Sequence, residues 1–173
     1  MPLAVVFVLI AALWRVVFTD AHGFTPVLAS LLFFGSRAER KWLWAPALLL
    51  ATTDVYLNYA HYGYKLTPDF LVTWAWYAAI VWLGSVLKEK QGWLRIAGVT
   101  LAGSISFFVL SNFMVWVVWN MYPRTLEGLL NCYAAGIPFY RNQFAGDLIF
   151  TAFAFALPSL LTSSEAQEHR VSG

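Results

Sequence analysis

The chain has 173 residues, of which 60% are hydrophobic and only 12% are charged, and its formal net charge is +2. A typical soluble domain has about 45 to 50% apolar and about 25% charged residues, so this composition indicates a membrane protein. The basic residues lie in short clusters between apolar stretches, an arrangement that argues against nucleic acid as a partner.

Six apolar stretches follow one another along the chain. A helix needs about 20 apolar residues to cross a hydrocarbon core of about 30 Å. Four stretches approach this length, and two more are shorter; in chain order the six are 3–19, 26–35, 43–57, 70–87, 96–119 and 144–161. We therefore expect an all-α integral membrane protein, a six-transmembrane-helix bundle in a single domain over residues 1–162, followed by a polar cytoplasmic tail at 163–173.

The second stretch, 26–35, is too short to span a bilayer, because ten residues reach only about 15 Å. Thr25 as an N-cap and Pro26 at the first helical position mark its start. The loop before it, residues 20–25, must then dip below the outer surface. Irregular backbone at that depth is tolerated only where protein or a water-filled cavity covers it, so we expect this loop to line or plug an outward-opening cavity.

Basic residues follow the second, fourth and sixth stretches, namely Arg37, Arg40, Lys41, Lys88, Lys90, Arg95 and Arg170. The positive-inside rule places these connections in the cytoplasm. We therefore expect both termini inside, and the loops 20–25, 58–69 and 120–143 outside.

Polar residues inside the predicted spans share one level. Arg15 and Asp54 lie about one turn from the outer ends of the first and third helices, Asp147 about one turn into the sixth, and Asn112 deeper on the fifth. Ionisable residues within spans usually face the bundle interior or a cavity. The three charged residues could contact a ligand or form a structural ion pair or triad, and the sequence leaves both readings open.

Aromatic residues accompany Asn112 on the fifth helix. Phe108, Asn112, Trp116 and Trp119 are spaced by four, four and three, which puts them on one face. Aromatic walls with a few placed polar groups are typical of a ligand cavity. Alternatively, Asn112 joins two helices by a hydrogen bond and the tryptophans belong to an interfacial belt.

The segment 120–147 is long for a connection between helices. Thr125 as an N-cap and the leucines after it predict a short interfacial helix that ends near Gly136 and Pro138. Such a segment could be a lid over the cavity mouth, bringing Tyr133 and Asn142 to the site, or it could only seal the bundle.

The stretches "FTPVLASLLFFG" (24–35), "SFFVLSNFMVW" (106–116), "YPRTLEGLLNCYAAGIPF" (122–139) and "NQFAGDL" (142–148), with Asp54, carry a family resemblance. The chain resembles a family of uncharacterised six-helix bacterial membrane proteins assigned to transport, which are similar to the substrate-binding S components of energy-coupling factor (ECF) transporters. The resemblance implies a multi-pass protein of the bacterial inner (cytoplasmic) membrane that captures a small vitamin-like ligand from outside. It also implies a transmembrane coupling protein with cytoplasmic ATPases as partners.

One feature departs from this family pattern. S components that dock on the coupling protein typically carry an Ala-x-x-x-Ala pair on the first helix, whereas this face reads Ala4, Val8 and Ala12 here. The small pairs Ala75/Ala79 and Gly98/Ala102 lie on other helices instead. The protein could therefore act alone or through a different interface.

The sequence thus favours a ligand-binding or transport protein, with membrane lipid around it, over an enzyme. Cys132 has no neighbouring histidine to activate it, and no catalytic, nucleotide-binding or metal-binding motif occurs, so we expect no catalytic residue, cofactor or metal. The alternative is a structural or accessory subunit of a larger membrane complex. The predicted ligand-binding residues are Arg15, Asp54, Asn112, Trp116, Trp119, Tyr133, Asn142 and Asp147.

Overall fold

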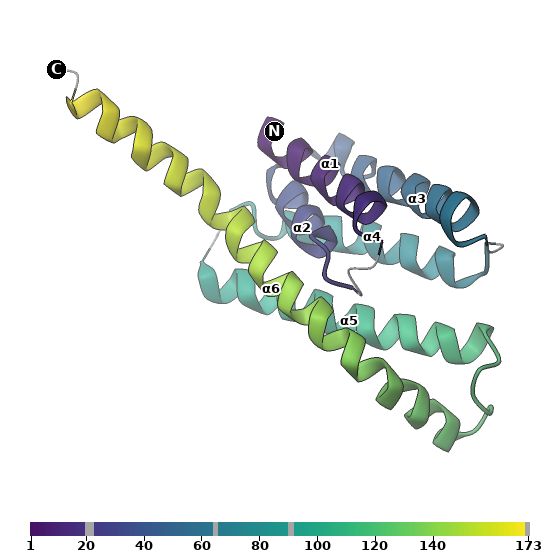
Figure 1. Cartoon of the computed structure of the whole chain (residues 1–173). Coiled ribbons are helices and arrows are strands. Elements are labelled where there is room, and N and C mark those ends of the chain that lie inside the picture. The colour runs from purple at the N-terminus through teal and green to yellow at the C-terminus, as the bar shows by residue number, and fades with distance from the viewer. Residues whose placement is uncertain (20–22, 64–65, 90–91, 172–173) are drawn as a thin grey trace.

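The computed structural model describes residues 1–19, 23–63, 66–89 and 92–171, without the side chains of 159 and 162–171. This part of the chain is all helical and contains no strand (Figure 1). The six α-helices are α1 (Pro2–Val17), α2 (Val27–Arg37), α3 (Ala45–Leu57), α4 (Asp69–Ser85), α5 (Trp93–Val118) and α6 (Leu126–Val171). A short 3-10 turn, η1 (Arg40–Trp42), precedes α3, and a π-helical turn, η2 (Asn58–Tyr62), continues it. The predicted all-α class with six helices is confirmed.

Helix α2 lies at the centre of the bundle, with α1, α4 and α6 around it (Figure 1). Ten of its eleven residues are buried, which explains why the sequence is apolar on every face of this helix. The prediction of a short second helix is confirmed. The predicted N-cap is wrong, however, because Pro26 occupies that position and no side chain caps the helix.

Two glycines set the close packing of α2 against α4. A Cβ on Gly35 would overlap the carbonyl oxygen of Val81, and a Cβ on Gly84 would lie 2.9 Å from the Cα of Leu32. The obstructing atoms are backbone and cannot rotate away. Small residues at both positions therefore allow the two helix backbones to touch.

Helix α1 covers one side of α2 with its small residues. Ala4, Val8 and Ala12 are all buried in the core of this chain. These three residues are therefore not exposed at the surface of the chain.

Helices α5 and α6 form an antiparallel hairpin. Thr125 Oγ1 accepts a hydrogen bond from the Gly128 amide at 3.1 Å, so the predicted cap of this helix is present. The predicted end near Gly136 and Pro138 is wrong, because α6 runs without interruption for 46 residues through Pro138. Tyr133 before the proline and Tyr140 after it both contact α5, and this packing outweighs the backbone hydrogen bond that proline removes.

The far part of α6 extends beyond the other helices (Figure 1). The predicted sixth span, 144–161, is therefore the middle of a longer helix rather than a separate one. By length and composition alone, α5 is the one described helix that could cross a membrane, while α1 and α2 are apolar but shorter.

Candidate functional site

Two adjoining cavities lie beside the C-terminal ends of α1 and α3. We call the end of the bundle where α1, α3 and α5 finish the distal end. Cavity I has a volume of about 230 Å³ and lies between α1, α3 and the start of α4. Cavity II has a volume of about 190 Å³ and reaches from α1 to α4, α5 and α6. Arg15, Gly23 and Thr25 line both cavities, so these three residues form the wall that the cavities share.

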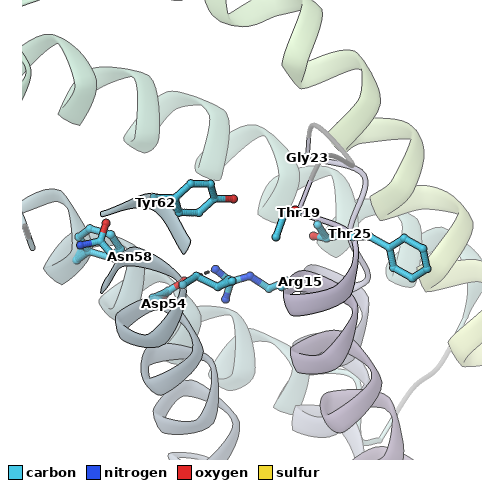
Figure 2. A pocket seen from close by; sticks show the side chains of 10 residues that line it. Arg15, Thr19, Gly23, Thr25, Asp54, Asn58 and Tyr62 are labelled. Carbon is cyan, nitrogen blue, oxygen red and sulfur yellow. Dashed lines mark hydrogen bonds and ion pairs between the residues drawn. The ribbon is translucent and has the colours of Figure 1, made fainter. Parts of the chain in front are cut away.

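Arg15 and Asp54 form an ion pair across cavity I (Figure 2). The guanidinium also donates to Thr53 Oγ1 at 3.2 Å. The second carboxylate oxygen of Asp54 accepts from Trp74 Nε1 at 3.0 Å. Only 4% of the Asp54 side chain is exposed, so a charge partner and a hydrogen-bond donor hold this carboxylate inside the protein.

Polar side chains lie beside this pair. Figure 2 shows Thr19 and Thr25 on the Arg15 side of the cavity, and Tyr62 and Asn58 of η2 on the Asp54 side. The π-helical turn continues α3 past its last α-helical residue and so brings both side chains to the cavity. Cavity I therefore offers hydroxyl and amide groups around a neutralised charge pair.

Asp147 of α6 lies in the wall of cavity II. Its carboxylate is buried and accepts a hydrogen bond from Gln143 Nε2 at 3.4 Å, one turn earlier on the same helix. The Ser104 hydroxyl of α5 lies beside it. Among the described residues, no lysine or arginine forms an ion pair with Asp147, so its carboxyl group has only the uncharged donor of Gln143 as a hydrogen-bond partner.

An aromatic cluster lines cavity II together with Asp147. It consists of Trp76 and Tyr77 of α4 and Phe107 of α5, which all line the cavity. The rings of Trp76 and Phe107 have centroids 4.7 Å apart, and Trp76 Nε1 donates to Ser106 Oγ at 3.0 Å. Because these contacts fix the rings, the wall is already formed.

The loop before α2 approaches α6 at Gly23. Its φ of +88° is in the left-handed region, which glycine adopts without strain. A Cβ there would lie 3.5 Å from the Cβ of Gln143. The structure thus places Gly23 and Thr25 of the predicted cavity loop in the walls of both cavities, while positions 20–22 lie outside the described residues.

The other predicted site residues lie elsewhere, on the α5–α6 hairpin. Asn112 Nδ2 donates to the Phe108 carbonyl at 2.8 Å, and its side chain packs against Gly136, where a Cβ would lie 2.9 Å from the Asn112 Cγ. Tyr133 donates to the Val109 carbonyl at 2.8 Å. Neither Asn112 nor Tyr133 lines cavity I or II, and their contacts fit the reading of Asn112 as a helix-packing residue.

The two tryptophans of the predicted stripe also stay outside the cavities. Trp116 Nε1 donates to the Pro123 carbonyl at 2.8 Å and thereby holds the turn before α6. Trp119 Nε1 donates to Asp69 Oδ2 at 3.5 Å, which links the end of α5 to the start of α4. Asn142 is exposed on α6, whereas its neighbour Gln143 lines cavity II.

Sequence reasoning did not single out several cavity residues, namely Asn58 and Tyr62 of cavity I and Trp76, Tyr77, Phe107 and Gln143 of cavity II. Thr25 was expected as a helix cap and as part of the cavity loop, and only the second expectation agrees with the structure. For Gln143 a signal existed, because it lies four residues before Asp147 and so shares its helix face. The aromatic residues carried no such signal, since the chain has 18% aromatic residues and most of them look alike by spacing.

Comparison with known proteins gives one result. No curated protein and no solved structure matches the chain. Residues 1–169 match the family described as "Family of unknown function (DUF6580)". Since this match covers nearly the whole sequence, the chain belongs to that family of unknown function.

Proposed function

We propose that this chain is a multi-pass membrane protein that binds a small molecule in cavities I and II, and that it acts in uptake like the S component of an ECF transporter. The observation that carries the binding role is the meeting of Arg15, Asp54 and Asp147 from three helices around two adjoining cavities. Polar groups in such a position fix the orientation of a ligand, while aromatic walls supply contact area.

The surface supports a membrane location. Leu94 is 92% exposed and Trp82 is 65% exposed, and water would be a poor solvent for so much apolar surface. One group of exposed aromatic residues lies at the end of the bundle opposite the distal end, namely Trp42, Trp44, Trp82 and Trp93. A second group lies near the distal end, namely Tyr56, Tyr59 and Trp119. Two aromatic belts of this kind are typical of the two membrane interfaces.

The orientation follows from the connections between helices. Lys88 donates a hydrogen bond to the Ala38 carbonyl, so the basic connection after α2 meets the basic connection after α4. By the positive-inside rule this end faces the cytoplasm, and cavities I and II then open toward the outside of a bacterial inner membrane. Helix α2 is about 16 Å long and would be shielded from lipid by its neighbours.

Labelling of introduced cysteines tests this topology. In a Cys132→Ser background, a Met121→Cys variant should react with a membrane-impermeant maleimide in intact cells. An Arg40→Cys variant should react only after the membrane is permeabilised. Equal labelling of both variants in intact cells would reject the proposed orientation.

Thermal unfolding of the purified protein with a panel of vitamins and their precursors tests the binding role. A ligand present at 100 times its Kd stabilises the folded state by about 2.7 kcal/mol. A Thr25→Leu variant, which fills the shared wall, should lose this stabilisation, whereas Thr52→Leu on the exposed side of α3 should keep it. If no compound stabilises the protein and mild detergent yields a fixed-stoichiometry partner, an accessory subunit is the correct reading.

A coupling protein would have to dock on a different surface of this chain than on a typical S component. A coupling protein with its cytoplasmic ATPases cannot dock on Ala4, Val8 and Ala12, since these residues are buried. Such a partner would have to use another surface, such as the exposed Ala75 and Ala79 of α4.

A further inference from the structure

The charges around cavities I and II do not cancel. Arg15 is paired with Asp54, so these two residues together contribute no net charge. Asp147 remains, buried in the wall of cavity II and without a cationic partner among the described residues. A buried carboxylate without an opposite charge is costly, and this cost falls when a cation enters the cavity.

The aromatic lining of cavity II suits a positive charge as well. Trp76, Tyr77 and Phe107 line the same cavity as Asp147. Ring faces attract an ammonium group within about 6 Å of the centroid, and the attraction is stronger where water is excluded. A cavity lined by a carboxylate and by aromatic rings offers an organic ammonium group both kinds of contact.

The size of the cavity argues against a bare metal ion. Cavity II has a volume of about 190 Å³, several times the roughly 30 Å³ that one water molecule occupies in the liquid. Its polar side chains are one guanidinium, one threonine hydroxyl, one tyrosine hydroxyl, one amide and one carboxylate, so it also lacks the ring of oxygen ligands that a hard cation needs.

On the basis of the proposed binding function, we propose that the ligand is a small organic cation, whose ammonium group binds between Asp147 and the rings of Trp76 and Phe107. Arg15 also lines cavity II, and its ion pair with Asp54 weakens the repulsion between its guanidinium and this group. The uncharged part of the ligand extends past Thr25 into cavity I.

Matched pairs of probes that differ in charge but not in shape test the proposal. We would measure binding of choline against 3,3-dimethyl-1-butanol, and of benzylammonium against benzyl alcohol, by thermal unfolding and by tryptophan fluorescence of the purified protein. The cation of at least one pair should bind at least tenfold more tightly than its neutral isostere. Asp147→Asn should weaken cation binding by about tenfold or more and abolish the preference for charge. Glu127→Gln, which removes an exposed carboxylate from the same helix, should change neither.

The outcomes separate this inference from the proposed function. Loss of charge preference in Asp147→Asn with unchanged binding of the Glu127→Gln variant supports a cation site. Equal binding of neutral and cationic members, or tighter binding of neutral or anionic compounds from the vitamin panel, overturns the inference and leaves the binding function standing. Absence of binding by every probe and every panel compound overturns both.

Discussion

The ion pair between Arg15 and Asp54 permits a quantitative test. Replacing Arg15 by methionine leaves the carboxylate of Asp54, which is only 4% exposed, with donors from Trp74 and Tyr77 but without a cation. Removing one partner of a buried pair typically costs about 3 to 5 kcal/mol. Because 17% of the Arg15 side chain is exposed, we expect the lower end, about 3 kcal/mol, for Arg15→Met.

The double variant Arg15→Met/Asp54→Asn should cost much less than the sum of the two single changes. It removes both charges at once, and the new amide can still accept a hydrogen bond from Trp74. Residues in one ion pair show interaction energies up to about 3 kcal/mol, and we expect about 2 kcal/mol here.

Reversible unfolding in mixed detergent micelles, followed by far-UV circular dichroism, would give the four free energies of unfolding for this cycle. Single substitutions that each cost less than about 1 kcal/mol would match an exposed pair rather than a buried one. Costs that simply add would show that Arg15 and Asp54 do not interact in the folded protein. Either result would refute the geometry on which cavity I depends.

Three further changes test the helix packing. Gly84→Ala should destabilise the fold by about 1 to 3 kcal/mol or more, because the new methyl group meets the backbone of α2. Gly98→Ala, whose methyl group meets nothing within 4 Å, should be neutral or stabilising. Thermal unfolding of both variants compares the two effects, and equal Tm values would contradict the close packing at Gly84. Thr125→Ala should cost about 1 kcal/mol through loss of the α6 cap, and a Thr125→Ser variant should retain the cap; unchanged stability in Thr125→Ala would exclude a capping role. Asn112→Leu should lower stability yet leave ligand affinity unchanged, because Asn112 packs against α6 outside both cavities. A Kd about tenfold higher in the folded variant than in the wild type would contradict that placement.

Much of the helical framework could be predicted before the structure. The first five predicted apolar stretches each coincide with a helix, and α2 is as short as its sequence indicated. The sixth stretch, 144–161, lies inside the longer α6. The start of α6 was readable too, because a threonine before an apolar stretch satisfies the free amides of the first turn. The helix end predicted at Pro138 is wrong, because contacts with α5 let α6 continue past the proline and no local sequence pattern contains those contacts.

The candidate site was likewise only partly predictable from the sequence. The sequence by itself indicated that Arg15, Asp54 and Asp147 face the protein interior, because these charged residues stand out in apolar helices; Asp54 and Asp147 are buried and Arg15 is half-buried. It could not determine that Arg15 pairs with Asp54 and leaves Asp147 alone, or that Asn112 faces α6 instead of a cavity. Those outcomes depend on the rotation and crossing of helices that are far apart in the chain. Only the tertiary structure decides them, through contacts such as the glycine crossing of α2 and α4.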